Sequence, residues 1–255
     1  MKRQSQFRWA VSLLLTGVCG LSLISCKTAT GAEKKRCVVV WSEATAPKDV
    51  YPKDINGAVA EGLACLDGWE VVRASIDDPQ QGLPDELLNR ADVLIWWGHK
   101  RHGEVQDALV DKIEKRVKED GMGFIALHSS HFAKPNKRLM GSPCSFSAYV
   151  TDSTTLKITV ADKQHPIAKG VAPEFTVNHE ERYSDPYKVP KADSIVFEGV
   201  ATLKNGTLDP SHQGYCWTIG KGRMFYFQVG HETNPIFYDK NIRKIMANAV
   251  LWAAP

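Results

Sequence analysis

Apolar runs of strand length, separated by amphipathic helical patterns, constrain the fold of this chain most strongly. Cys37–Trp41, Asp92–Trp97 and Gly123–His128 are such runs, and each suits a strand that is buried on both faces of a parallel sheet. Helical patterns lie between them over residues 55–66 and 104–118, and an Asp-Gly pair follows each one. The alternation predicts an α/β fold of flavodoxin-like type, with a doubly wound, mostly parallel sheet in a three-layer α/β/α arrangement.

The later part of the chain is less regular but still carries element signals. We expect further strands over residues 69–74, 156–160, 194–200 and 223–229, a hairpin turn at Asn205-Gly206, and a final amphipathic helix over residues 239–252. No internal repeat, low-complexity tract or linker interrupts the pattern. We therefore predict a single domain over residues 36–255, with an elaborated insert from about residue 140 to 222.

The first 25 residues have the pattern of a secretory signal. Three basic residues precede an uncharged, mostly apolar stretch that is too short for a comfortable membrane span and leads directly into Cys26. Small or apolar residues before a cysteine fit a lipobox, in which Cys26 becomes the acylated first residue and residues 26–35 form a tether. The alternative is an ordinary signal peptide cleaved near Ala29 or Ala32. We expect a lipid-anchored protein that faces the periplasm or the cell exterior.

The charge of the chain argues against one class of partner, and its cysteine content argues against one kind of metal site. The chain carries 32 Lys+Arg and 29 Asp+Glu, and the first 25 residues hold three basic and no acidic residues, so the remainder has 29 of each. A formal net charge of zero without a basic run argues against nucleic acid. Four scattered cysteines follow Cys26 and form no CxxC pair, which argues against a thiolate zinc site. After the first 25 residues, no apolar stretch is long enough to span a membrane.

Histidines follow several of the predicted strands. His99 comes one residue after the strand over residues 92–97, His128 and His131 lie at the end of the fourth strand, and His231 follows the late strand. Ligands bind outside the carboxyl ends of strands in open parallel sheets. We therefore expect imidazoles from distant parts of the sequence to meet in one pocket.

Two chemistries could use these imidazoles. In the first, His99, His128 and His231 bind a divalent metal, with zinc as the expected ion and a carboxylate from Glu180 or Glu181 nearby. In the second, a metal-free His231-Glu232 pair relays a proton. That pairing is weakened because adjacent residues on an extended segment point to opposite sides.

Other polar and aromatic residues at this edge have two interpretations each. Ser129 follows a strand at a sharp turn, the place of a nucleophile, although the flanking glycines of GxSxG are missing and a helix N-cap is the alternative for Ser129 or Ser130. Trp97 and Tyr183 could stack on a sugar ring. For these aromatics, core packing is the alternative. Trp97, Ser129 and Tyr183 are our candidate substrate-binding residues.

Ten segments, in this order and spacing, resemble the trehalose-utilisation (ThuA) family over almost the whole chain after the leader. They are Val50–Pro52, Trp96–His99, Gly121–Gly123, Leu127–Phe132, Leu139–Gly141, His165–Ile167, Glu181–Tyr183, Gly222–Phe227, Gly230–Glu232 and Asn248–Trp252. The resemblance implies a class I glutamine-amidotransferase-like fold and a role in the catabolism of trehalose and related disaccharides. In amidotransferases a cysteine occupies the turn where His128-Ser129 stands here, so glutamine hydrolysis is not expected. His231-Glu232 resembles the late His and Glu of the amidotransferase triad.

Two segments depart from the family pattern. Ser145–Tyr149 stands where family members often carry a Trp-Arg pair, and Ser211–Gly214 stands in place of an Arg-Ser-Gly element. The loss of these arginines removes contacts to an anion or a hydroxyl. The substrate of this chain is therefore expected to differ from that of members that match better.

These observations lead to one main hypothesis and two alternatives. The main hypothesis is an enzyme that acts on a disaccharide or an oxidised saccharide through metal-dependent, hydrolase- or lyase-type chemistry, in which His131, Glu181 and Glu232 orient ligands or move protons. The first alternative is a non-catalytic carbohydrate-binding lipoprotein, and the second is an esterase or peptidase that uses Ser129. The expected partner is a small saccharide, and the oligomeric state stays open between monomer and homodimer.

Overall fold

The computed structural model describes residues 35–178 and 181–255, and Lys35–Pro255 form one compact unit. The predicted signal segment, Cys26, nearly all of the tether and Glu180 lie outside the described residues. Within the described ranges, no helix has the length and apolar character needed to cross a bilayer.

Nine strands of the described chain form one sheet, and its first half is parallel. The order is β2-β1-β3-β4-β11-β10-β9-β6-β7, and β2, β1, β3, β4 and β11 run parallel to one another. This order, 2-1-3-4-5 once β11 is counted as the fifth strand, is that of flavodoxin. The parallel strands are β1 (Arg36–Ser42), β2 (Trp69–Ser75), β3 (Val93–Trp97), β4 (Gly123–Leu127) and β11 (Gly222–Phe227).

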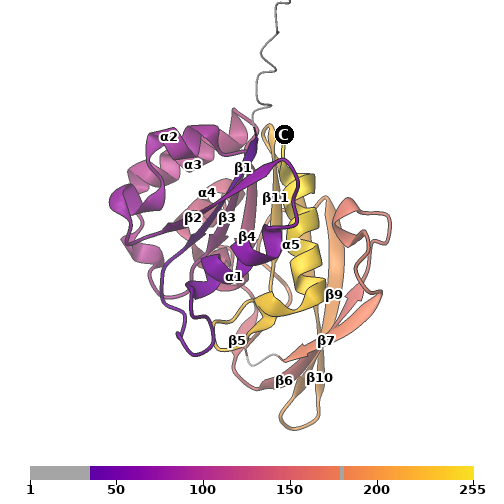
Figure 1. Cartoon of the computed structure of the whole chain (residues 1–255). Coiled ribbons are helices and arrows are strands. Elements are labelled where there is room, and N and C mark those ends of the chain that lie inside the picture. The colour runs from indigo at the N-terminus through magenta and orange to yellow at the C-terminus, as the bar shows by residue number, and fades with distance from the viewer. Residues whose placement is uncertain (1–34, 179–180) are drawn as a thin grey trace, which may run out of the picture. The chain divides into compact units, whose positions relative to one another are not determined.

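The predicted insert extends the same sheet with antiparallel strands, on the orange side of the ribbon in Figure 1. The hairpin turn at Asn205-Gly206 joins β9 to β10, as expected. A separate two-stranded sheet pairs β5 with β8. The strands of this region are β5 (Ala148–Val150), β6 (Ser153–Val160), β7 (Glu174–Asn178), β8 (Arg182–Ser184), β9 (Ser194–Leu203) and β10 (Leu208–Ile219).

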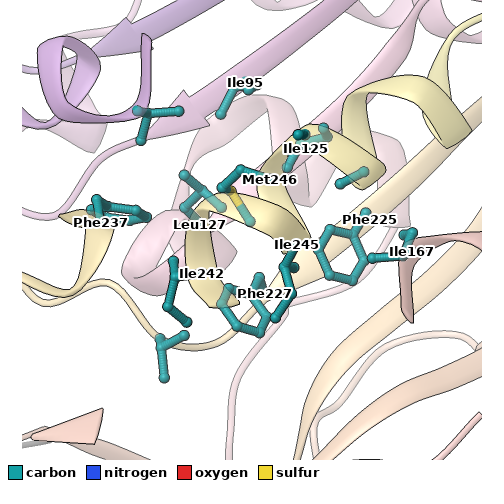
Figure 2. Close-up of a cluster of buried hydrophobic side chains, with 14 of the residues drawn as sticks. Ile95, Ile125, Leu127, Ile167, Phe225, Phe227, Phe237, Ile242, Ile245 and Met246 are labelled. Carbon is teal, nitrogen blue, oxygen red and sulfur yellow. The ribbon is translucent and has the colours of Figure 1, made fainter. Parts of the chain in front are cut away.

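Helices cover both faces of the parallel strands, because alternate side chains of each strand point to opposite faces. Val38 and Val40 pack with α1 and α5, whereas Val39 and Trp41 pack in a second core with α3. Figure 2 shows the first core, where α5 lies against phenylalanines of β11. The helices are α1 (Asp54–Leu63), α2 (Asp85–Arg90), α3 (Asp107–Lys118), α4 (Lys134–Met140) and α5 (Lys240–Ala253).

The predicted α/β fold class is confirmed, and the differences lie at element ends. The helix expected from residue 104 begins at Asp107, after a short 3-10 turn over His102–Glu104. The strand expected to include His128 ends at Leu127, since His128 starts a 3-10 helix over His128–Phe132. These corrections shape the site, because they place histidines on turns at the carboxyl edge of the sheet.

Burial along α5 gives a stability prediction. Ile245 is fully buried under the sheet, while Leu251 of the same helix is 53% exposed. Replacing Ile245 with Ala should lower the free energy of unfolding by about 2–5 kcal/mol, because the removed methyl groups leave a cavity. Leu251→Ala should change it by less than about 1 kcal/mol. Chemical denaturation of both variants measures the difference, and equal losses would contradict the assigned packing of α5.

Candidate functional site

Three histidines from separate strand ends meet at the carboxyl edge of the parallel sheet. His99 follows β3, His128 follows β4 and His231 follows β11. Their ring centres lie 5.2–5.8 Å apart. Glu181, which directly precedes β8, is fully buried beside them. The expected convergence of these three imidazoles is therefore present in the structure, and the insert supplies the carboxylate.

The backbone at His128 is held in an unusual conformation. Its φ is 54°, in the left-handed region that side chains with a Cβ rarely adopt. The neighbouring Gly230 has a φ of 144°, and a Cβ there would come within 2.9 Å of the His128 Cβ. An imidazole thus occupies the sharp strand-to-helix turn at which some hydrolases place a nucleophile. Gly230, in the loop that follows β11, allows that loop to approach the imidazole.

Ser129 and Ser130 fasten this turn to the end of β3. The Ser130 hydroxyl donates to Trp96 O at 3.0 Å and accepts from the Gly98 N–H at 2.8 Å. The Ser129 hydroxyl donates to Gly98 O at 3.1 Å. Neither side chain caps the 3-10 helix, and the Ser129 hydroxyl donates to a backbone carbonyl rather than to an imidazole. The geometry gives no support to a serine nucleophile.

Trp97 corrects one of the candidate substrate-binding assignments. Its ring is 1% exposed and belongs to the core on the α1 and α5 side, so neither face is open to a sugar. The indole N–H donates to Gly230 O at 2.9 Å. Trp97 therefore holds the loop after β11 in place and does not contact a ligand.

Glu181 is the most heavily hydrogen-bonded group of the site. Its carboxylate accepts from the hydroxyls of Tyr183 and Tyr149, the latter at 3.1 Å, and lies 3.0 Å from Nε2 of both His128 and His231. Burial raises the pKa of Glu181, but the close imidazoles of His128 and His231 and the hydrogen bond from Tyr183 lower it more, so the pKa lies well below its usual range. The carboxylate is therefore ionised at neutral pH.

The proton positions on His128 follow from its neighbours. Nδ1 lies 3.0 Å from Gln228 O, and because a carbonyl oxygen only accepts, Nδ1 carries the proton. Burial also lowers the pKa of this imidazole, which keeps it neutral. Nε2 is then an unprotonated acceptor that lies 3.0 Å from a carboxylate oxygen of Glu181 and 3.2 Å from the Tyr183 hydroxyl, which itself donates to Glu181. Two acceptors at this distance repel unless a proton or a cation lies between them.

His99 has the same arrangement. Its Nδ1 lies 2.7 Å from Glu232, whose other oxygen lies 2.7 Å from Lys100 Nζ. Burial raises the pKa of Glu232, but the hydrogen bonds from His99 and Lys100 bring it down to about 2. An ionised Glu232 makes His99 Nδ1 the donor. His99 Nε2 lies 3.9 Å from the Glu181 carboxylate.

His231 completes the cluster. Its Nδ1 lies 2.7 Å from the Thr233 hydroxyl, and its Nε2 lies 3.0 Å from Glu181 and 3.8 Å from Glu232. The Thr233 backbone N–H donates to Nδ1 at 3.4 Å, which favours the His231 proton on Nε2, where it faces Glu181. The adjacent His231 and Glu232 both reach the cluster because they lie on a turn, after β11 has ended.

Two sets of side chains here could hold a metal ion, and they share His231. In each set the ligand atoms lie within 4.8 Å of one another. The sets are His128, Glu181 and His231, and His99, His231 and Glu232. In metal sites, a ligating histidine typically donates its second ring N–H to a carbonyl or carboxylate. His128 on Gln228 O and His99 on Glu232 both follow this pattern.

A cavity of about 220 Å³ opens beside the cluster. Among the predicted residues, Ser129, His131 and Tyr183 line it, and Tyr183 also donates to Glu181. The complete lining consists of His99, His102, Ser129, His131, Phe132, Tyr149 and Tyr183. His131 sits among aromatic rings, with its centre 4.7 Å from that of Tyr183, and its Nδ1 lies 3.2 Å from His128 O.

Two groups at this edge were not predicted from the sequence. Glu43 follows β1, is 1% exposed and accepts the backbone N–H groups of Lys100 and Arg101, which fixes the loop that carries His99. Its position after a buried parallel strand was a usable signal. Tyr149 reaches Glu181 from the short strand β5, and no sequence pattern marked it.

Comparisons with known proteins agree with the fold. The family model described as "ThuA: Trehalose utilisation" matches residues 37–253. A ThuA-like protein from Bacteroides uniformis ATCC 8492 is 19% identical with a TM-score of 0.59, over 88% of this chain and 94% of that one. A ThuA-like protein from Parabacteroides merdae ATCC 43184 is 13% identical with a TM-score of 0.58, over 87% and 90%. At these identities the solved structures show the fold alone. No curated protein matches the sequence.

The burial of His131 gives a pH prediction. Burial lowers its pKa to about 3, below the ordinary value of about 6.5 expected in the unfolded chain. Between these values the unfolded state binds more protons, so acidification from about pH 7 to about pH 4.5 should lower the free energy of unfolding by about 2–3 kcal/mol from this group. His131→Phe should reduce the loss of stability between about pH 7 and about pH 4.5, as measured by chemical denaturation. An unchanged loss would contradict a neutral, buried His131.

Proposed function

This chain belongs to the ThuA family, and on that premise we propose that it is an exported enzyme that acts on a saccharide at a divalent metal centre. The ligands in this proposal are Nε2 of His99, His128 and His231 together with the Glu181 carboxylate. The observation that carries it is the pair of acceptors formed by His128 Nε2 and Glu181 at 3.0 Å, with the His128 proton committed to Gln228 O.

Ligand spacing supports a bound ion. Atoms held at about 2.0–2.1 Å around a tetrahedral zinc ion are about 3.3 Å apart. The three imidazole nitrogens lie 3.0, 3.0 and 3.9 Å from the Glu181 oxygens. His128, Glu181 and His231 already lie within reach of one ion, and His99 would have to move toward them to join it. Imidazoles with a carboxylate suit zinc and also iron, so metal analysis must identify the ion.

A bound divalent ion would polarise a carbonyl or lower the pKa of water, which suits hydrolase- or lyase-type chemistry on a saccharide. The remaining groups act around it. Glu232 orients His99 and is itself held by Lys100. Tyr149 and Tyr183 orient the Glu181 carboxylate, and His131 lines the cavity as a neutral imidazole that can hydrogen-bond a hydroxyl.

The saccharide class is supported by the family description and by the cavity. The matching family is described by its role in trehalose utilisation. Hydroxyl and imidazole groups beside aromatic rings suit a sugar, which presents many hydroxyls and apolar C–H faces. The alternative is a lipoprotein that binds a carbohydrate without catalysing a reaction. The two segments that depart from the family pattern favour this alternative.

Removing His128 tests the metal centre. His128→Ala should reduce the affinity for zinc at least about 100-fold and abolish turnover of saccharides. The substitution deletes a ligand whose ring is oriented by the hydrogen bond from Nδ1 to Gln228 O, with Nε2 facing Glu181. Metal content of the purified protein, measured by mass spectrometry, and titration with zinc give the result. The matched control is His165→Ala, since His165 packs on Trp252 of α5 and is in neither metal set.

Several outcomes separate the two functions. Stoichiometric metal that is lost in His128→Ala but kept in His165→Ala supports the metal centre. Wild-type protein that binds sugar but takes up no added zinc, iron or manganese favours the non-catalytic alternative. A chelator should also lower the Tm of the wild-type protein if the ion binds only the folded state.

The lipid anchor is a separate proposal. Cys26→Ser should abolish incorporation of radiolabelled palmitate and release the protein from the membrane fraction, because acyl chains on Cys26 are the proposed attachment. Cys65→Ser is the control, since Cys65 is an exposed free thiol. Labelling that persists in Cys26→Ser would contradict the anchor.

A further inference from the structure

Tyr149 brings an exposed aromatic ring to the cavity beside the metal cluster. Its surface is 56% exposed, and it lines the cavity of about 220 Å³ together with Tyr183. The two rings expected from the sequence to stack on a sugar are covered, since Trp97 is 1% and Tyr183 is 2% exposed. Tyr149 is therefore the tyrosine of this site whose ring a ligand can reach.

Phe132 is the other exposed aromatic residue of the lining, at 41%, but its ring is partly occupied. The Nζ of Lys137 lies over the Phe132 ring, 4.8 Å from its centre, and the ring centre of His131 lies 4.2 Å away. In the described chain the ring of Tyr149 contacts one other ring, that of Tyr183. The second face of Tyr149 is therefore open.

The two-stranded sheet of β5 and β8 fixes the direction of Tyr149. Tyr149 pairs directly with Tyr183, and directly paired residues of antiparallel strands lie on the same face. Glu181 shares that face because it stands two residues before Tyr183. The Tyr149 hydroxyl donates to Glu181 at 3.1 Å, and its ring stacks on that of Tyr183 with centres 5.7 Å apart and planes at 24°.

Arg182 fastens the same two-stranded sheet from its opposite face. Its guanidinium pairs with Asp152 at 2.8 Å and with Asp209 at 2.5 Å. Asp209 belongs to β10 of the main sheet, and Asp152 immediately precedes β6. The strand that pairs with Tyr149 is thus tied to the rest of the fold. A ring held in this way loses little conformational freedom when a ligand binds.

The size of the cavity determines which part of a saccharide reaches Tyr149. A volume of about 220 Å³ is below the roughly 300 Å³ at which pockets for drug-sized ligands begin. The cavity therefore holds one ring of a disaccharide and leaves the other ring at the rim. An exposed tyrosine face suits that outer ring, because a sugar ring presents apolar C–H groups on its faces.

We propose that Tyr149 is a specificity-determining residue whose open face stacks on the outer ring of a neutral disaccharide, while the inner ring enters the cavity toward the metal cluster. The proposal rests on the proposed function for its saccharide class, and adds which ring is held and by which side chain. The hydroxyl and the ring of Tyr149 then have separate tasks. The hydroxyl orients Glu181, and the ring binds the sugar.

Two substitutions separate these tasks. Tyr149→Ala removes the ring and should weaken trehalose binding about tenfold, because the outer sugar ring loses its stacking partner. Tyr149→Phe keeps the ring and removes the hydroxyl. It should bind trehalose within about threefold of the wild type at saturating zinc. It should bind zinc about tenfold more weakly, because the Glu181 ligand loses a hydrogen bond that orients it.

The experiment is calorimetric titration of the purified protein with trehalose and with methyl α-glucoside, with and without added zinc. Methyl α-glucoside has no outer ring, so it should bind at least about fivefold more weakly than trehalose, with less than about twofold change in Tyr149→Ala. Tyr238→Ala is the matched control and should leave both sugar affinities unchanged. Tyr238 is also exposed, at 37%, and also stacks on a tyrosine at 24°, but it is not part of the cavity lining.

Each contrary result overturns a defined claim. Unchanged trehalose affinity in Tyr149→Ala refutes the role of Tyr149, and so does an equal loss in Tyr149→Phe at saturating zinc, which would assign the effect to the hydroxyl. Methyl α-glucoside that binds as tightly as trehalose refutes the outer-ring contact. Zinc uptake without any sugar binding refutes the role of Tyr149 and leaves the metal centre standing. Trehalose binding that depends on the Tyr149 ring, in a protein that takes up no added zinc, iron or manganese, leaves that role standing and refutes the metal centre.

Discussion

The contact between His128 Nε2 and the Glu181 carboxylate governs the chemistry of this molecule. Both groups are fully buried, and Gln228 O holds the only proton of the neutral imidazole on the opposite nitrogen. An acceptor pair in a dry interior is unfavourable by several kcal/mol unless positive charge lies between the partners. The fold nevertheless fixes both groups, one on a turn with a positive φ and the other under two tyrosine hydroxyls. A protein that maintains such a contact is built to receive a cation or a proton there.

The parallel sheet explains how this contact is maintained. Strands β3, β4 and β11 are neighbours or next neighbours, so their carboxyl ends deliver His99, His128 and His231 to one edge. Ser130 ties the turn after β4 to β3, and Trp97 ties the loop after β11 to β3. The rings thus lie on a backbone that is cross-linked by buried hydrogen bonds. Ligands positioned by strand ends and braced turns are placed more accurately than ligands on free loops.

Much of this could be predicted from the sequence, and the reasons for the failures are physical. Continuous apolar runs located the parallel strands, and strand topology then brought the three histidines together. Trp97 was misassigned because an aromatic residue at a strand end has the same local pattern whether its ring faces the core or a cleft. Tyr149 and the contacts of Glu181 were out of reach, since they depend on how β5 and β8 pair, and three-residue strands have no detectable periodicity. The unpaired, buried nitrogens of His102 are visible only in three dimensions.

The segments that depart from the family pattern now have a structural account. Phe146 lies in the segment that replaces the Trp-Arg pair, and its ring stacks on Tyr187 and Tyr183 with centres 4.2 and 5.2 Å apart. In the other segment His212 pairs with Asp185 at 2.7 Å, away from the cluster cavity. Neither segment leaves a cation in the cavity lining. A site that keeps its buried carboxylate but presents only hydroxyls, imidazoles and aromatic rings to a ligand recognises shape and hydrogen bonding rather than charge, and this favours a neutral saccharide over an acidic or phosphorylated one.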